Sequence, residues 1–149
     1  MQTFIPFSDT LRSAVCLDRQ RLGKQRVECL QILNALTGDS GWKHHPAVSM
    51  WRNREGALAD YGVIICDEWI ARGYKDTCRA KIMSLAKSFP ITSFQMPDWW
   101  GKPELHLSHR SNLLRKLPDH YNQYFPNDPD NLPYVWPNAS LETRLDKSH

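Results

Sequence analysis

The feature that most constrains the fold of this chain is helical periodicity without strand alternation. Apolar residues recur at steps of three, four and seven, the spacing that places them on one face of an α-helix. The first such stretch predicts a helix that begins near Ser8 or Asp9 and ends at Gly38. We expect a break near Leu17 and Asp18. The expected buried stripe consists of Leu11, Val15, Leu22, Cys29, Leu33 and Leu36.

Three further helices follow from the positions of glycine, proline and capping residues. The second covers about 47–72, because Gly73 suits the position just after a helix. The third covers about 76–87 and begins at an aspartate that can cap it. The fourth covers about 104–116 and ends before Pro118.

The last part of the chain differs from the rest. From Tyr121 onward it is rich in aromatic residues, and four prolines rule out a long helix. A length of 149 residues fits one domain with its own core. We therefore expect an all-α protein, a compact single domain over residues 1–149, with about four helices and an aromatic, proline-rich, irregular C-terminal segment.

Composition and missing motifs exclude several classes of protein. No apolar run approaches the roughly 20 residues that span a bilayer, and the start has no signal-peptide pattern, so we expect a cytoplasmic protein without a membrane partner. Walker A, dinucleotide, serine-hydrolase and zinc-protease motifs are missing, so we expect no cofactor. None of the four cysteines lies in a Cys-x-x-Cys pair, which predicts buried free thiols rather than a zinc site. They are Cys16, Cys29, Cys66 and Cys78.

The net charge of +3 is mild, but the cations are concentrated in two clusters. Clustered cations bind phosphates, and the aromatic residues that follow the second cluster suit stacking on an unpaired base. The alternative is two solvated helix faces. The first cluster comprises Arg12, Arg19, Arg21, Lys24 and Arg26, and the second comprises Arg110, Arg115 and Lys116.

One carboxylate shares a helical face with two of these cations. At about 100° per residue, Arg21, Lys24 and Glu28 project in similar directions. A carboxylate within reach of two cations stays ionised, and it can serve as a base or as an electrostatic stabiliser. The alternative is an ordinary surface pair of Lys24 and Glu28.

Two groups of histidines stand out. His44 and His45 are adjacent at the start of the second expected helix, where their side chains do not converge on a metal, so we expect no metal. They can instead contact a phosphate or sugar, or satisfy a backbone group. In the fourth helix a polar face is expected opposite the leucines. It consists of His106, His109, Arg110 and either Asn112 or Lys116.

Three blocks of the sequence, in order, resemble the pyrimidine-dimer DNA glycosylase family over nearly the whole chain. The resemblance is strongest to a short bacterial and actinobacterial branch. The first block is Leu17-Asp18-Arg19 with Leu22 and Glu28; the second is His45-Pro46 with Arg72-Gly73-Tyr74; the third is Ser108-His109-Arg110 with Arg115-Lys116, Pro118 and Tyr121.

The resemblance implies a compact helical domain that excises a base from DNA without a metal. In the family, the amine of the first residue attacks C1′ of the sugar, and a glutamate in the position of Glu28 acts as acid and base. The resemblance and the cation clusters together imply double-stranded DNA with a flipped base as the partner, bound by a monomer. Expected DNA contacts are Arg19, Arg21, Arg26, His44, His45, His109, Arg110, Arg115, Lys116 and Tyr121.

Two departures from the family leave alternatives open. Gln2 is too bulky for ready removal of Met1, so the nucleophile is the Met1 amine, Lys24 or an activated water. The family commonly has an arginine just before the glutamate, where this chain has Val27. The substrate is therefore a damaged or a chemically modified pyrimidine, with or without lyase activity at the abasic site. The other classes to weigh are a transferase that acts on modified bases and a non-catalytic DNA-binding module.

Overall fold

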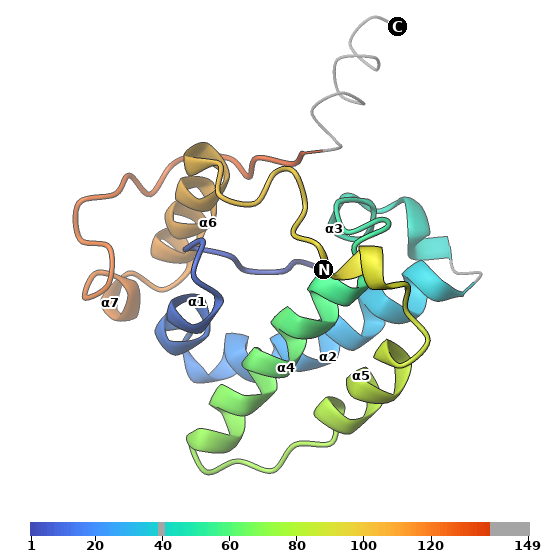
Figure 1. The fold of residues 1–149 in the computed structure, drawn as a ribbon. Helices are drawn as coiled ribbons and strands as arrows, with labels where there is room; N and C mark the ends of the chain where they lie inside the picture. The colour runs from blue at the N-terminus through green and yellow to red at the C-terminus, as the bar shows by residue number, and fades with distance from the viewer. Residues whose placement is uncertain (39–40, 138–149) are drawn as a thin grey trace, which may run out of the picture.

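The computed structural model describes residues 1–38 and 41–137, and this part of the chain is helical without a strand (Figure 1). The expected all-α class is confirmed. The elements are α1 (Thr10–Cys16), α2 (Arg19–Thr37), η1 (Gly41–His44), α3 (Pro46–Ser49), α4 (Glu55–Ala71), α5 (Cys78–Ala86), η2 (Ile91–Phe94), α6 (Pro103–Lys116) and α7 (Pro118–Tyr121).

The expected break in the first helical stretch is confirmed. Leu17 has extended backbone angles, and the Asp18 carboxylate accepts a hydrogen bond from the Arg21 N–H, which starts α2 as a new helix. Because α1 turns away from α2, two residues of the predicted stripe are not buried. Leu11 and Val15 are 58% and 43% exposed, whereas the later residues of the stripe lie in the core or against it.

The expected helix over 47–72 is wrong as a single element. It is divided into α3 and α4, which are joined by a turn in which Asn53 has a left-handed φ of 64°. Asparagine tolerates this conformation, and the Asn53 N–H donates to the Glu55 side chain at 3.0 Å. The turn contains no proline or glycine, so the sequence carries no strong signal for it.

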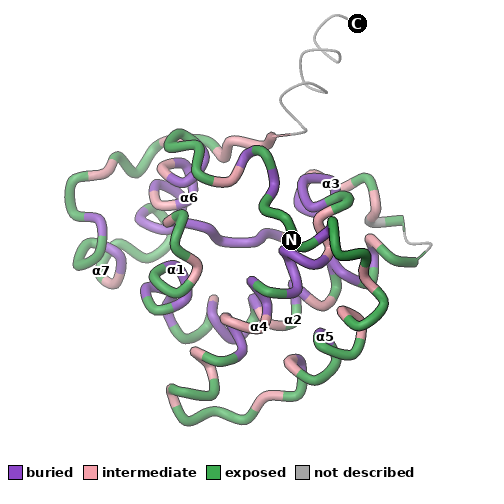
Figure 2. The backbone as a smooth tube through the Cα atoms, in the orientation of Figure 1, coloured by how far each residue is buried: buried purple, intermediate pink, exposed green. Residues whose placement is uncertain are grey.

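The N-terminal segment, residues 1–7, is extended and crosses the middle of the molecule between α6 and the α2–α4 layer (Figure 1). Most of it is buried (Figure 2). Since no strand pairs with it, side chains from the surrounding helices must satisfy its backbone groups. They do so from Gln25 and Glu28 of α2, Tyr61 of α4, and His106, His109 and Arg110 of α6.

These contacts also correct the polar face expected on α6. His106, His109 and Asn112 are buried rather than solvated. The His109 Nδ1 accepts from the Ile5 N–H at 2.9 Å, and the His106 Nδ1 lies 2.9 Å from the Ile5 carbonyl oxygen. His106 and His109 thus bind the backbone of the N-terminal segment, whereas the Asn112 amide donates to the Leu132 carbonyl oxygen of the C-terminal segment.

The irregular C-terminal segment packs back over α6. The Ser111 and Ser108 hydroxyls accept from the N–H groups of Leu132 and Val135 at 2.9 and 3.0 Å. All four cysteines are free and buried, as predicted. Within the described ranges, no helix combines the length and apolar character needed to cross a bilayer.

Candidate functional site

A cavity of about 300 Å³ opens beside the first residue of the chain. It brings together three parts of the sequence: the N-terminal segment, one face of α2, and the end of α6. The three residues predicted as catalytic, Met1, Lys24 and Glu28, all line it. We call this cavity the Glu28 pocket; its lining also includes Gln2, Phe4, Gln20, Arg21, Gln25 and Lys116.

Glu28 does more than form a surface ion pair with Lys24. Its side chain is only 11% exposed, and its Oε2 accepts a hydrogen bond from the Gln2 N–H at 2.8 Å. This N–H belongs to the peptide bond that follows Met1, so the carboxylate lies one residue from the α-amine. Lys24 approaches the other oxygen of Glu28 at 3.7 Å, but its side chain is 77% exposed. The structure therefore fixes Glu28 to the N-terminal segment, while Lys24 lies at the solvent-exposed edge of the Glu28 pocket.

Gln25 holds the same segment one turn earlier on α2. Its Oε1 accepts from the Phe4 N–H at 2.7 Å, and its Nε2 donates to the Gln2 carbonyl oxygen at 2.8 Å. The Tyr61 hydroxyl donates to the Phe4 carbonyl oxygen at 2.7 Å. These bonds fix the path of residues 2–4 and therefore the place of Met1.

Gln25 is not among the residues predicted from the sequence, although its position carries a signal. Gln25 lies three residues after Leu22 and four before Cys29, which puts an amide on the buried stripe of α2. A buried amide needs hydrogen-bond partners, and here they are the backbone groups of the N-terminal segment.

The two predicted cation clusters meet around the pocket. Burial lowers the pKa of Lys116, and the positive charges of Arg21, Arg115 and Lys24 lower this pKa further, while Glu28 opposes the shift. Charges that influence one ammonium group in this way lie close together in space. We call Arg21, Lys24, Arg115 and Lys116 the cationic rim.

Two other predicted cations are held in ion pairs. Arg26 binds Asp76 at 2.6 Å, with its guanidinium 4.5 Å from the Trp69 ring centroid. Arg110 binds Asp128 at 2.7 Å and also donates to the Pro6 carbonyl oxygen. Arg19 is exposed at the start of α2.

Two residues predicted to contact DNA, His109 and Tyr121, lie in the interior of the protein instead. His109 is 1% exposed, and burial lowers its pKa to about 3, which keeps the ring neutral. The Tyr121 ring stacks on Phe125, and its hydroxyl donates to the Asp18 carboxylate. Because neither ring reaches the surface, both have structural roles.

His45 satisfies a backbone group, which is one of the two roles considered for it. Its Nδ1 accepts from the Ala47 N–H at 3.0 Å and so caps α3. Burial lowers its pKa, and the positive charge of the N-terminus lowers it further, so the ring lies near Met1. His44 is exposed and lines a different cavity. Among the described residues, no three His, Cys, Asp or Glu side chains are grouped so that they could bind a metal ion.

The site combines one recessed carboxylate, the first residue of the chain and a rim of cations on an all-helical domain. This arrangement suits an enzyme that acts on a nucleic acid. The family model described as "Pyrimidine dimer DNA glycosylase" matches residues 1–82, more than half of the chain. The chain belongs to the pyrimidine dimer DNA glycosylase family, whose name gives DNA as the substrate. No curated protein and no solved structure matches the chain.

Proposed function

We propose that this protein excises a damaged or modified pyrimidine from double-stranded DNA, with the Met1 amine as nucleophile and Glu28 as acid and base. The observation that carries the proposal is the 2.8 Å hydrogen bond from the Gln2 N–H to Glu28, which holds the first residue beside a recessed carboxylate. The family name supports base excision from DNA. The pocket and the hydrogen bond support these two residues as the reacting groups.

The proposed reaction begins at C1′ of the target nucleotide. The lone pair of the neutral amine forms the N–C1′ bond while the C1′–N1 bond breaks, and the electron pair leaves with the base, which takes up a proton. Glu28 accepts a proton from the amine. Glu28 then passes this proton to O4′ as the C1′–O4′ bond breaks, and the lone pair on the attacking nitrogen forms the C=N bond of a protonated imine, which leaves Glu28 ionised again. In a lyase step, loss of a C2′ proton to Glu28 breaks the bond from C3′ to the phosphate oxygen.

Met1 is the preferred nucleophile over Lys24 for two reasons. Lys24 is mostly exposed, and its ammonium is engaged in an ion pair with Glu28 at 3.7 Å. An ordinary α-amine has a pKa near 8, so a larger share of it is neutral near pH 7 than of an ordinary lysine. We assign Lys24 to phosphate binding with the rest of the cationic rim and with Arg19.

The size of the pocket favours a single extrahelical nucleotide. A volume of about 300 Å³ lies at the lower end of the range for small-molecule sites. Chemistry at C1′ requires the target nucleotide to leave the base stack, and three cations of the rim, Arg21, Lys24 and Lys116, line the pocket and can bind its phosphates. One monomer supplies all of these groups.

Borohydride trapping tests the proposal. Purified protein, with an intact mass showing Met1 in place, is incubated with ultraviolet-treated, abasic and base-modified duplexes in the presence of borohydride. We expect a covalent protein–DNA product, because borohydride reduces an imine to a stable amine, and peptide mapping should place the DNA on Met1. A variant with two residues added before Met1 should lose the cross-link, since each residue moves the amine by about 3.5 Å; the same addition after His149 is the control.

Other outcomes would redirect the assignment. DNA attached at Lys24 would replace Met1 as the nucleophile. Excision without a cross-link would mean a water-dependent glycosylase. A change in the mass of the base without strand cleavage would favour a transferase, and binding without any chemistry would favour a DNA-binding module.

A further inference from the structure

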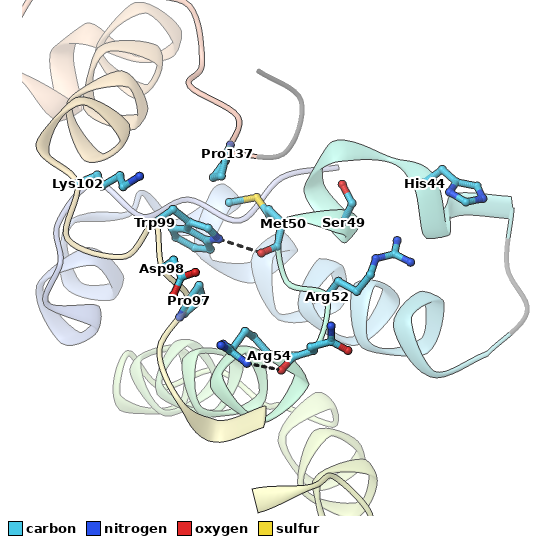
Figure 3. Close-up of a pocket in the computed structure, with 11 residues that line it drawn as sticks. His44, Ser49, Met50, Arg52, Arg54, Pro97, Asp98, Trp99, Lys102 and Pro137 are labelled. Atoms are coloured by element: carbon cyan, nitrogen blue, oxygen red, sulfur yellow. Dashed lines mark hydrogen bonds between the residues drawn. The ribbon is translucent and has the colours of Figure 1, made fainter. Parts of the chain in front are cut away.

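A second and larger cavity lies at the turn between α3 and α4. Its volume is about 670 Å³, and it shares no lining residue with the Glu28 pocket. We call it the corner cavity. Figure 3 shows His44 and Arg52 on one side of it and Trp99 and Lys102 on the other.

Positive charge dominates the lining of the corner cavity. Arg52, Arg54 and Lys102 line it together with His44, and Asp98 is the one carboxylate among the described lining residues. The Arg52 guanidinium donates to the Lys43 carbonyl oxygen at 2.6 Å, and that of Arg54 donates to the Asn53 carbonyl oxygen at 3.0 Å. A guanidinium has five N–H donors, so each arginine keeps donors for a ligand.

These two arginines differ from five other arginines that the structure describes. Arg21, Arg26, Arg72, Arg79 and Arg110 each form an ion pair with a carboxylate, whereas Arg115 resembles Arg52 and Arg54, because its guanidinium donates to the carbonyl oxygens of Asp130 and Leu132. Arg52 and Arg54 are instead bound to carbonyl oxygens, which position a guanidinium without neutralising it. Two guanidinium groups that are held in place and keep their positive charge can bind an external anion.

The walls of the corner cavity are fixed by packing. The Trp99 indole N–H donates to the Met50 carbonyl oxygen at 2.9 Å, and its ring meets Trp51 edge-to-face at 5.0 Å. Trp99 is only 5% exposed, so its face is not free to stack on a base. The cavity therefore offers several cations and no aromatic platform, a combination that suits phosphates rather than nucleobases.

One aromatic contact lies between the surroundings of the N-terminus and the lining of the corner cavity. The His45 and Trp136 rings meet edge-to-face at 6.4 Å. Their chain neighbours, His44 and Pro137, line the corner cavity, and His45 itself lies near the N-terminus. The His45–Trp136 contact therefore joins the surroundings of the Met1 amine to the lining of the corner cavity.

We propose that the corner cavity binds backbone phosphates of the same DNA duplex that the Glu28 pocket engages, with Arg52, Arg54 and Lys102 as the contacts. The proposal rests on the proposed function, and it extends the DNA path beyond the cationic rim. Each phosphate contact releases condensed counterions, so it steepens the dependence of affinity on salt.

The test measures binding rather than excision. The Arg52→Gln/Arg54→Gln double variant is prepared in the Glu28→Gln background, and its affinity for a duplex is measured by fluorescence anisotropy at several salt concentrations. The slope of log K against log salt should become less steep by about 0.9 for each lost contact, roughly 1 to 2 in all. The control, Arg79→Gln/Lys81→Gln, removes two charges from α5 and should keep the parent slope.

A second variant keeps the test independent of local damage at the turn. Lys102 lies on the opposite wall of the corner cavity. The substitution Lys102→Gln should make the slope of log K against log salt less steep by roughly 0.9. Parent slopes in both variants would overturn the proposal. Saturable binding of a nucleoside triphosphate that the double variant loses, with its DNA slope unchanged, would also overturn it by assigning the cavity to a free nucleotide. Because the readout is binding by an excision-defective background, lack of glycosylase activity would contradict the proposed function without touching this result.

Discussion

At the scale of single residues, Glu28 makes two separable contributions. One oxygen binds the Gln2 N–H, and the carboxylate lines the Glu28 pocket, where we propose that the reaction takes place. The substitution Glu28→Gln keeps an oxygen that can accept from Gln2 but removes the charge. We expect single-turnover excision to fall by at least about 100-fold, the lower end for a lost general acid or base. DNA binding should be kept or strengthened, because the substitution removes a negative charge from the proposed phosphate-binding surface.

The matched control for this change is Glu104→Gln. Glu104 is an exposed carboxylate in the first turn of α6, so its loss changes the net charge by the same amount. Excision by the Glu104 variant should stay within about twofold of the parent rate. An active Glu28→Gln protein would instead reduce Glu28 to a structural anchor for the N-terminal segment.

The sequence predicts some of these residues and misses others for a physical reason. The helical phase of Arg21, Lys24 and Glu28 follows from chain spacing alone, and the structure places all three around one pocket. The partners of Gln25 and His109 cannot be predicted in this way, because they are backbone groups of a distant extended segment. Periodicity indicates which face of a helix is buried, but not what packs against that face.

At the scale of elements, the N-terminal segment depends on α2 through Gln25. The substitution Gln25→Leu keeps the volume but leaves the Phe4 N–H and the Gln2 carbonyl without their buried partner. Each unsatisfied group costs about 1–3 kcal/mol, so we expect the free energy of unfolding to fall by at least about 2 kcal/mol. Denaturant unfolding measures this loss, and hydrogen exchange should show faster exchange at the Phe4 amide.

Gln31→Leu provides the control on the same helix. Gln31 is exposed, and a surface substitution of this kind changes stability by about 0.5 kcal/mol or less. Equal effects of the two substitutions would contradict the role assigned to Gln25.

The helix boundaries show which local signals suffice to predict where a helix begins or ends. The break before α2 has a capping aspartate and the end of α4 has Gly73 with a φ of 95°, and both were predicted. The turn between α3 and α4 was not predicted, because apolar spacing continues through Trp51 and the residues that depart from helical geometry, Asn53 and Arg54, are neither glycine nor proline. That turn carries the arginines of the corner cavity, so the same omission hid the cavity.

At the scale of the whole molecule, two buried histidines make stability depend on pH. Burial lowers the pKa of His106, and burial followed by the charge of His106 lowers the pKa of His109 from 6.5 to about 3. The unfolded chain therefore binds protons that the folded chain excludes, so stability is full above about pH 6.5 and falls as the pH is lowered. Each histidine contributes at most about 1.4 kcal/mol per pH unit. Denaturant unfolding at a series of pH values checks the slope.

His109→Asn is the variant that separates this effect from general acid unfolding. The asparagine oxygen can replace Nδ1 as the acceptor for Ile5 but cannot take up a proton in this range. Hydrogen bonds from Tyr121 and Arg21 lower the pKa of Asp18 despite its burial, so its contribution disappears only below about pH 4. A variant whose stability still falls as steeply between pH 6.5 and 5 would contradict the assignment to His109.

The position of the N-terminal segment has a consequence for biosynthesis. Residues 1–7 are synthesised long before α6, yet the bond from the Ile5 N–H to His109 joins residues 104 positions apart. The bonds from Gln25 and Glu28 to residues 2–4 need only α2, whereas the bonds at Ile5 need α6 in place. A chain that stops before α6 therefore keeps the partners that hold Met1 but leaves the backbone groups of Ile5 without theirs, which a buried segment cannot tolerate without cost.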